Sequence, residues 1–289
     1  MASIRQLKSR IRSVKNTKQI TRAMEMVAAS KMRRAQEATK ETSAYAHAAN
    51  ELLTYLGGQN VTDTHPYFEQ RQVAKRLLIV IASDKGLAGA YNSNVLRRLT
   101  RELKEDAEMG IATAVVTIGR RATRFAARLK GVEILGAYDD MSDKPSGHEL
   151  RTIVNTAINS FTSGEVDAVD VIFTEFHNAV KQEVAMQRVL PAGYTYTATC
   201  DYACDAKYEP SPAVVLDAVA YRLIEAQVFQ TLLDARASEH SMRMVAMKNA
   251  TDNASDLADD LTLEMNKARQ GAITQELAEI SGGVEAMNN

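Results

Sequence analysis

Two long stretches of the chain, one at each end, contain almost no residue that would break a helix. All five prolines lie between Pro66 and Pro212, residues 1–56 contain neither glycine nor proline, and residues 213–281 contain only Gly271. An interior proline removes a backbone donor and clashes with the preceding turn, so a long unbroken helix requires such a stretch. The pattern therefore predicts one long helix at each end.

The N-terminal stretch carries apolar side chains on one face. They recur at helical spacing and are interrupted by the polar run 16–18; they are Ile4, Leu7, Ile11, Val14, Ile20, Met24 and Val27. A one-sided stripe opposite a basic face is typical of a helix that packs against a partner. The pair Gly57–Gly58 is a good C-terminal stop, and the helix would be roughly 80 Å long.

The C-terminal stretch begins at Ser211–Pro212, a capping residue followed by proline at the first helical position. From Leu216 onward, an alternation of three and four selects seventeen positions, fourteen of them apolar if alanine is counted. They are Leu216, Val219, Leu223, Ala226, Gln230, Leu233, Ala237, His240, Met244, Met247, Thr251, Ala254, Ala258, Leu261, Met265, Ala268 and Ala272. A repeat sustained this long predicts a coiled-coil seam, in a helix of roughly 100 Å.

The middle of the chain alternates short apolar runs with helical segments. Strands are expected at 76–82, 111–118, 132–135, 168–175 and 183–190, the last at an edge, with helices at 92–107, 120–129 and 148–161. Apolar strands that alternate with helices predict βαβ units and a mostly parallel sheet. The expected fold is therefore α/β (α+β overall): a long antiparallel coiled coil of the N- and C-terminal helices with an inserted Rossmann-like α/β domain.

The expected parts of the chain follow from these boundaries. They are an N-terminal helix at 1–56, a linker at 57–74, the Rossmann-like α/β domain at 75–193, a loop at 194–210 and a C-terminal helix at 211–289. Winding the two helices together is the simplest way for one chain to bury both stripes.

Composition narrows the class of protein. The chain has 289 residues, is 45% hydrophobic and 25% charged, and carries a net charge of −1, which is ordinary for a soluble protein and gives no overall field for nucleic acid. It has no apolar run long enough for a transmembrane helix and no apolar signal-peptide core. The first 36 residues carry ten basic side chains and one acid, Glu25, a balance also typical of a transit peptide.

Candidate catalytic or cofactor-binding groups are scarce. The glycine-rich run 84–92 follows the first strand, where a dinucleotide-binding turn would lie, but its spacing is G-x-x-G, and Gly119–Arg120 stand where an acid would close the second strand. A tight turn is the favoured interpretation and a nucleotide site the alternative, so no cofactor is expected.

The histidines show no metal-ligand spacing; they are His47, His65, His148, His177 and His240.

The two cysteines, Cys200 and Cys204, are spaced C-x-x-x-C, which matches no common zinc or redox motif, so they are expected to be free thiols.

The basic N-terminal helix is either a solvated face or a surface for an acidic partner. Because residues 1–44 contain no aromatic side chain, base stacking is disfavoured and acidic protein loops fit better.

Four segments resemble one family, in the right order along the chain. They are 20–34 (ITRAMEMVAASKMRR), 83–92 (SDKGLAGAYN), 243–253 (RMVAMKNATDN) and 268–283, which contains ARQ and ITQELAEISGG. Together they are similar to the gamma subunit of F-type ATP synthases; Val284 departs conservatively from the family's usual alanine. The chain looks too short for the cysteine loop of the chloroplast versions, and a start at Met1 suggests a bacterial chain whose basic helix belongs to the mature protein.

The resemblance implies a non-catalytic rotor shaft, which transmits ion-driven rotation of a membrane ring to a catalytic hexamer. Its implied partners are three alpha and three beta subunits, epsilon and the c-subunit ring, without nucleic acid or membrane insertion. Its implied location is peripheral, on the cytoplasmic face of the cell membrane. The implied contacts with the surrounding subunits are Met24, Lys31, Arg33, Arg34, Arg243, Arg269, Gln270, Thr274 and Glu276.

Two other classes of protein remain as alternatives. An α/β enzyme with helical dimerisation arms would need a pocket with convergent polar groups, which the sequence does not indicate. A coiled-coil protein that binds nucleic acid through its basic helix would show salt-sensitive binding. Neither alternative explains the ordered matches to one family.

Overall fold

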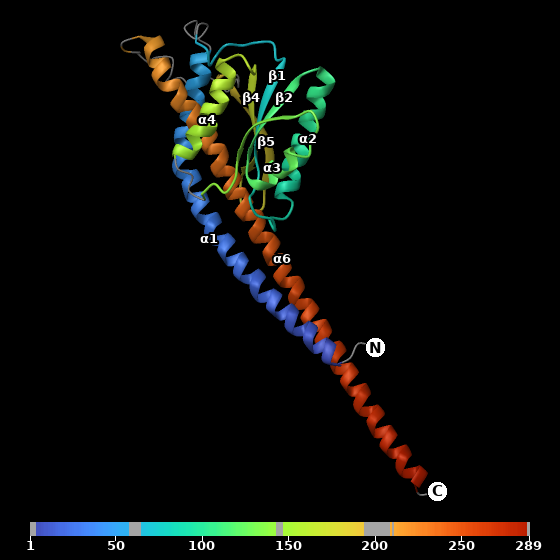
Figure 1. Ribbon diagram of the computed structural model, residues 1–289. Helices are drawn as coiled ribbons and strands as arrows, with labels where there is room; N and C mark the ends of the chain where they lie inside the picture. The colour runs from blue at the N-terminus through green and yellow to red at the C-terminus, as the bar shows by residue number, and fades with distance from the viewer. Residues whose placement is uncertain (1–3, 58–64, 143–146, 194–208, 210, 288–289) are drawn as a thin grey trace. The chain divides into compact units, whose positions relative to one another are not determined.

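The computed structural model describes residues 4–57, 65–142, 147–193, 209 and 211–287. The chain divides into a smaller unit, Met1–Val27 with Met244–Asn289, and a larger unit, Ala28–Arg243. Two long helices contribute to both units: α1 (Ile4–Gly57) and α6 (Pro212–Met287) (Figure 1). The predicted pair of terminal helices is therefore confirmed.

The larger unit contains a five-stranded sheet with the order β3-β2-β1-β4-β5. Its strands are β1 (Lys75–Ile81), β2 (Ala112–Ile118), β3 (Glu133–Tyr138), β4 (Ala168–Phe176) and β5 (Gln182–Leu190). The first four strands run parallel, and β5 pairs antiparallel with β4 at the edge. The predicted mostly parallel sheet with an edge strand is confirmed, with strand ends shifted by a few residues.

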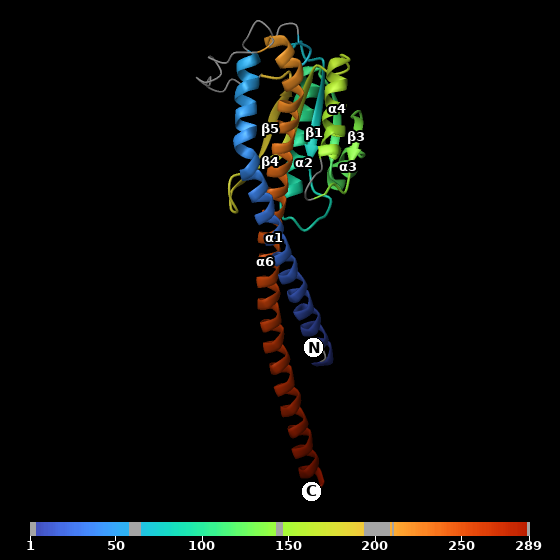
Figure 2. The same ribbon diagram turned by 90° about the vertical axis from the view of Figure 1, so that its left-hand side faces the viewer.

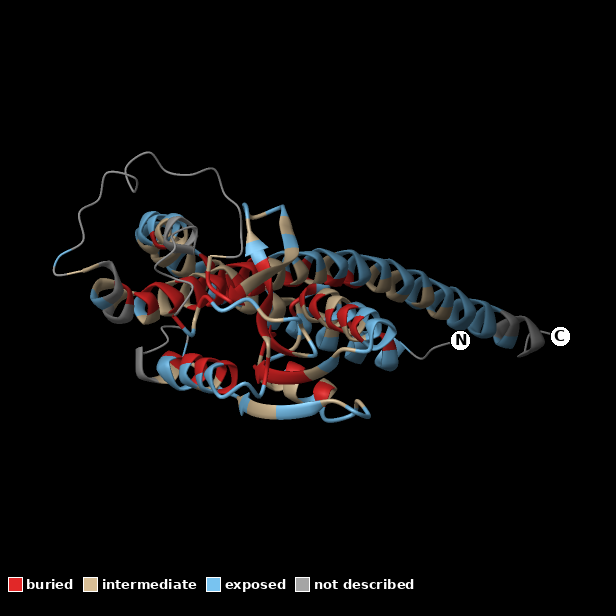
Figure 3. Cartoon of the chain, turned by 90° about the horizontal axis from the view of Figure 1, so that it is seen from above, coloured by how far each residue is buried: buried red, intermediate tan, exposed pale blue. Residues whose placement is uncertain are grey.

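Helices cover both faces of the sheet. One face packs against α2 (Tyr91–Met109) and α3 (Arg120–Ala126), and the other against α4 (Gly147–Thr162) together with the parts of α1 and α6 that belong to this unit (Figure 2). Figure 3 shows the buried residues gathered in the sheet and in the helical segments that pack on it. This arrangement is the expected α/β domain.

Strand β1 shows why its sequence is apolar throughout. Leu77 and Ile79 point into the core under α4 and α6, whereas Leu78 and Val80 point into the core under α2. Successive side chains of a strand alternate between the two faces, so a strand covered on both sides needs apolar residues at every position.

In each unit α1 and α6 run antiparallel. The evidence is their hydrogen-bonded pairs, in which the residue number on α6 falls as the residue number on α1 rises. In the smaller unit the Lys18 ammonium donates to the Ser255 hydroxyl at 2.8 Å, and the Thr251 hydroxyl donates to that of Thr21 at 2.8 Å. In the larger unit the corresponding pairs are Thr42 with Gln230, at 2.8 Å, and Asn50 with Gln227, at 2.6 Å. The predicted antiparallel pairing is confirmed within both units.

The α6 seam lies where the heptad pattern predicts. None of the seventeen predicted seam positions is exposed, and Met247 and Ala254 are buried. In the smaller unit, apolar residues between seam positions are exposed, as Leu257 and Leu263 show, whereas in the larger unit residues such as Ile224 and Leu232 are buried as well.

On α1 the predicted stripe is wrong after Val14. Ile20 and Val27 are 60% and 56% exposed, and Met24 is half-buried. The inward positions follow one alternation of three and four that passes through polar residues: Leu7, Ile11, Val14, Lys18, Thr21, Glu25, Ala28, Met32, Ala35, Thr39, Thr42, Ala46 and Ala49. Lys18 and Thr21 hold inward positions because they hydrogen-bond to α6, so a purely apolar criterion selects the wrong face.

Candidate functional site

Helix α6 crosses the carboxyl ends of the sheet strands, where open α/β sheets usually bind their ligands. The Ser238 hydroxyl donates to the Thr174 carbonyl near the end of β4, and the Ser241 hydroxyl donates to the Ala179 carbonyl beyond it, each at 3.0 Å. On the same part of α6, four side chains lie against the loops that follow β1 and β3: Arg236, Glu239, His240 and Arg243. We call this region the α6 junction.

Arg236 is the centre of the α6 junction and is only 5% exposed. Its guanidinium donates to Glu239 at 3.1 Å and to the Met141 carbonyl at 3.1 Å, and lies 3.8 Å from Asp84. Burial disfavours its charge, but the negative charges of Glu239 and Asp84 favour it, and the pKa of Arg236 is raised. The side chain is therefore a fixed cation inside the larger unit.

Asp84 connects the loops that Arg236 reaches. One of its carboxylate oxygens accepts hydrogen bonds from the backbone N–H of Arg120, at 3.1 Å, and from that of Asp140, at 3.0 Å. Arg120 follows β2 and Asp140 follows β3, so a single carboxylate joins the ends of three neighbouring strands.

Arg243 extends the α6 junction by one turn of the helix. Its guanidinium donates to Glu239 at 2.8 Å and to the carbonyls of Lys85 and Gly86 at 3.2 and 3.4 Å. His240, predicted as a packing residue of the seam, is 4% exposed, and its Nδ1 lies 3.3 Å from the Arg243 guanidinium. The structure thus places Arg243 against the turn after β1.

A cavity of about 260 Å³ lies at the α6 junction. Both signs of charge line it: Lys31, Lys85, Arg236 and Arg243 are basic, and Asp84, Asp140 and Glu239 are acidic. The structure therefore brings together two of the predicted contact residues, Lys31 and Arg243.

The glycine-rich run after β1 forms a tight turn held by its own side chains. The Asn92 carboxamide accepts from the Ser83 N–H at 3.0 Å and donates to the Ser83 hydroxyl at 2.8 Å. Leu87 and Gly89 adopt positive φ angles of 61° and 55°. The hydrogen bonds of Asn92 and the positive φ of Gly89 are structural uses of these residues, and they support the tight-turn interpretation.

A second cluster of charges lies at the α2 side of the sheet. Arg76 of β1 contacts Glu102 at 3.1 Å, Asp106 at 2.9 Å and Asp170 at 3.4 Å, and Arg188 of β5 also pairs with Asp170. Burial raises the pKa of Asp170, and Arg188 opposes that shift. The cluster joins β1, β4 and β5 to α2.

The remaining predicted contact residues lie on helix surfaces. Arg33 and Arg34 are exposed on α1 in the larger unit, and Met24 is half-buried in the smaller unit. The residues predicted near the C-terminus are all exposed on α6; they are Arg269, Gln270, Thr274 and Glu276. Apolar side chains stand among them, with Ile273, Leu277 and Ile280 between 50% and 65% exposed. This end of α6 is therefore both polar and apolar on its surface.

Sequence reasoning missed Asp84, Arg236 and Glu239 as partners. One signal was available, because Arg236, Glu239 and Arg243 are spaced by three and four and so share one face of α6. The partner on the β1 turn, about 150 residues away in sequence, carries no comparable local signal.

Within the described ranges, no group of three or more histidine, cysteine, aspartate or glutamate side chains could hold a metal ion. Cys200 and Cys204 lie outside the described residues, as does the side chain of His148. Among the helices that are described, none is long and apolar enough to cross a membrane.

Comparison with known proteins gives a consistent result. A family model described as ATP synthase matches residues 3–287. The ATP synthase gamma chains of Stenotrophomonas maltophilia (strain R551-3) and Xylella fastidiosa (strain M12) are each 41% identical over 288 residues, which cover 99% of this chain and 100% of each relative.

Solved structures show the same fold. A chain of the Euglena gracilis mitochondrial ATP synthase aligns with a TM-score of 0.67 and 18% identity, over 98% of this chain and 94% of that one. A chain from the central stalk and c-ring of the Tetrahymena thermophila enzyme aligns with a TM-score of 0.60 and 23% identity, over 80% of this chain and 99% of that one. With identity and coverage this high among the bacterial relatives, the chain belongs to the ATP synthase gamma chain family.

Proposed function

We propose that this chain is the central rotor shaft of an F-type ATP synthase. It transmits the rotation of an ion-driven membrane ring to a catalytic hexamer of three alpha and three beta subunits, and carries rotation in reverse during ATP hydrolysis. As a gamma chain, it is a non-catalytic subunit. The observation that carries the proposal is a pair of long antiparallel helices without an interior proline, in a chain that matches bacterial gamma chains over their full length.

The mechanism depends on the asymmetry of the helix surfaces. In α1, Ile20 and Val27 point outward as an apolar face, whereas Arg33 and Arg34 expose positive charge. Each angle of the shaft would present a different face to each beta subunit. Contacts that differ between the open and closed forms of a nucleotide site shift its equilibrium, and equal contacts shift nothing.

Two sets of contacts follow from this proposal. Met24, Lys31, Arg33 and Arg34 form a basic collar that faces acidic loops of beta. Arg269, Gln270, Thr274 and Glu276 form an upper contact near the C-terminus, which their exposure on α6 supports. Arg243 acts from within the chain, since its guanidinium holds the turn after β1.

We further propose how the parts of the chain divide the work. Residues 1–56 and 211–289 supply the shaft, and residues 75–193 form a foot that rests on the c-subunit ring beside epsilon, with 57–74 and 194–210 as connections. The protein would then be peripheral on the cytoplasmic face of the cell membrane. Solved assemblies that contain related chains include a c-ring and an F1 head, which supports this arrangement.

Reconstitution tests the proposal. The chain is mixed with alpha and beta subunits, and the stoichiometry, ATP hydrolysis and rotation of a bead attached at Cys200 or Cys204 are measured. We expect one copy of the chain for every three alpha–beta pairs, and rotation that requires ATP. A chain that stays free of alpha and beta, or that hydrolyses ATP by itself, would overturn the proposal.

A further inference from the structure

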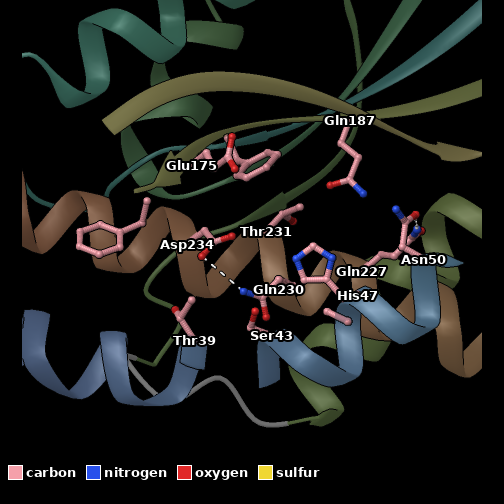
Figure 4. Close-up of a pocket in the computed structure, with 13 residues that line it drawn as sticks. Thr39, Ser43, His47, Asn50, Glu175, Gln187, Gln227, Gln230, Thr231 and Asp234 are labelled. Atoms are coloured by element: carbon pink, nitrogen blue, oxygen red, sulfur yellow. Dashed lines mark hydrogen bonds between the residues drawn. The ribbon is translucent and has the colours of Figure 1, made fainter. Parts of the chain in front are cut away.

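A polar cavity of about 340 Å³ lies within the larger unit, away from the α6 junction. Figure 4 shows side chains from α1, from α6 and from the sheet converging on it. Helix α1 contributes Thr39, Ser43, Ala46, His47 and Asn50; α6 contributes Gln227, Gln230, Thr231 and Asp234; and the strands contribute Phe173, Glu175, Phe176 and Gln187. We call this space the amide cavity, because four of these side chains are carboxamides.

Oxygen atoms dominate the polar lining of the amide cavity. Besides the carboxamides it contains three hydroxyl groups and two carboxylates, and lysine and arginine are absent from its described lining. Its only basic candidate is the imidazole of His47. The cavity therefore favours a guest that donates hydrogen bonds and carries positive charge.

Asp234 is the carboxylate of the amide cavity that would gain most from a cationic ligand. It accepts a hydrogen bond from the Gln230 carboxamide at 3.4 Å, which is a long contact, and in the described part of the chain no lysine or arginine pairs with it. The Thr39 hydroxyl oxygen, also in the lining, is buried and has no hydrogen-bond partner. Buried polar groups in folded proteins are normally paired, so both atoms are available to a ligand.

The charge state of Asp234 agrees with this geometry. Burial raises its pKa to about 7; the Gln230 hydrogen bond lowers it, Glu175 raises it and His177 lowers it. The groups that face it from other elements are His47 on α1 and Glu175 and His177 at the end of β4, while β5 contributes the neutral Gln187. Among the residues that the structure describes, no lysine or arginine compensates the carboxylate.

We propose that the amide cavity binds a small organic cation with primary ammonium groups, of the linear diamine class. One ammonium group would pair with the Asp234 carboxylate and with the surrounding carboxamide and hydroxyl oxygens. The methylene chain would lie against Phe173 and Phe176, whose rings also attract a cation. Glu175, whose side chain is 48% exposed, would receive the second ammonium group at the opening.

A diamine fits the amide cavity better than a metal ion does. The volume exceeds that of a bare cation, and the described residues include no cluster of three metal-ligating side chains. Carboxamide and hydroxyl oxygens are acceptors suited to the three N–H donors of an ammonium group.

The proposal predicts that the affinity for a diamine depends on pH. A diamine pairs with the ionised carboxylate, so binding must release a proton wherever Asp234 is protonated in the free protein. With half-ionisation near neutral pH, the ionised fraction rises about tenfold between pH 6 and pH 8. The affinity for a diamine should rise by about the same factor.

The test is calorimetric titration of the full chain with 1,4-diaminobutane, with 1,4-butanediol as a probe of the same length without charge. We expect saturable binding of the diamine at pH 8, about tenfold weaker binding at pH 6, and no binding of the diol. Substitution of Asp234→Asn keeps the shape and removes the charge, and should weaken the binding at least tenfold.

An exposed carboxylate on the same helix provides the matched control. Asp259→Asn should leave diamine binding unchanged, because Asp259 is exposed and belongs to the smaller unit. Equal binding of the diamine by wild type and Asp234→Asn, absence of binding at pH 8, or equal binding of the diol would each overturn the proposal. A parallel titration with magnesium chloride tests whether the amide cavity binds a metal ion instead. Saturable magnesium binding that Asp234→Asn abolishes would show that the ligand is a metal ion and would overturn the diamine proposal.

Discussion

Gly119 occupies a position where no side chain fits. It lies between β2 and α3 with φ +93°, and a Cβ atom built there would be 2.2 Å from the Ala82 carbonyl oxygen. The contact is with backbone, which cannot rotate away as a side chain would. The close approach of the two strand ends therefore depends on this glycine.

We expect Gly119→Ala to lower the free energy of unfolding by at least about 2 kcal/mol, because strain at positive φ and overpacking each cost about 1–3 kcal/mol. Gly131→Ala is the matched control: its φ is +79°, but no atom lies within 4 Å of the added Cβ. The control should lose only about 1 kcal/mol. Urea denaturation of both variants measures the difference, and equal losses would refute the steric argument.

Asp234 should make stability depend on pH. Burial raises its pKa to about 7 in the folded state, whereas an unfolded aspartate titrates near ~4. The folded state therefore holds a proton that the unfolded state has lost, and stability falls as pH rises from about 4 to about 7.

We expect Asp234→Asn to remove that slope and to be more stable than the wild type at pH 8, by about 2–4 kcal/mol. At pH 4 the two proteins should be nearly equal. Thermal unfolding between pH 4 and pH 8 measures this, and a wild type at least as stable as the variant at pH 8 would contradict the assigned titration.

At the scale of elements, the two long helices differ in how well their patterns could be interpreted. The seam of α6 is predictable because nearly all its positions are apolar. The seam of α1 is not, because it passes through Lys18, Thr21 and Glu25 while Ile20 and Val27 face outward. The apolar residues that mislead the prediction, Ile20 and Val27, belong to segment 20–34, one of the four that resemble gamma subunits.

This correction predicts unequal effects of two truncations in α1. Leu7 is 1% exposed and Ile20 is 60% exposed. Leu7→Ala should destabilise the paired helices of the smaller unit by about 2–3 kcal/mol, and Ile20→Ala by no more than about 0.5 kcal/mol. Hydrogen exchange of the amides in residues 4–27 measures both variants. Equal acceleration of exchange in the two variants would instead support the apolar face of α1 that was predicted from the sequence.

The α6 junction is an element-scale contact that the sequence does not reveal, since Arg236 and Asp84 are distant along the chain. Replacing Arg236 with methionine would remove the cation beside Asp84 and would leave Glu239, which is buried, with Arg243 as its remaining partner. We expect Arg236→Met to cost about 3–5 kcal/mol, the usual cost of breaking a buried pair. Chemical denaturation measures it.

The double variant Arg236→Met with Glu239→Leu separates charge from packing. It also removes the buried carboxylate that has lost one of its two cations, and should recover part of the lost stability. A double variant that is less stable than Arg236→Met would show that Glu239 contributes mainly through its contact with Arg243.

At the scale of the whole molecule, the α/β fold, the terminal helices and their antiparallel pairing could all be predicted, because each depends on a repeating pattern of apolar positions. The α6 junction and the amide cavity could not be predicted. They depend on single polar residues from α1, α6 and the strands, and no period in the sequence links such residues.

The proposed basic collar predicts a difference between two substitutions in the assembled enzyme. Met24→Lys adds a charge where the shaft passes acidic loops, and should lower ATP-driven proton pumping more than ATP hydrolysis, because it stabilises one angle of rotation. Arg33→Ala should barely alter hydrolysis, since exposed ion pairs contribute about 0–1 kcal/mol each. Pumping and hydrolysis are measured in the same vesicles. Normal pumping by Met24→Lys, or a large loss of hydrolysis in Arg33→Ala, would count against the collar.

The position of α6 across the strand ends has a consequence for how the α/β domain can behave. Proteins with this kind of sheet commonly alternate between an empty and an occupied state as a ligand enters and leaves the crevice there. Here Arg236 and Arg243 occupy that edge through contacts with Asp84, Met141, Lys85 and Gly86, and they belong to the same chain. The α/β domain therefore resembles a binding protein whose ligand is a segment of its own chain.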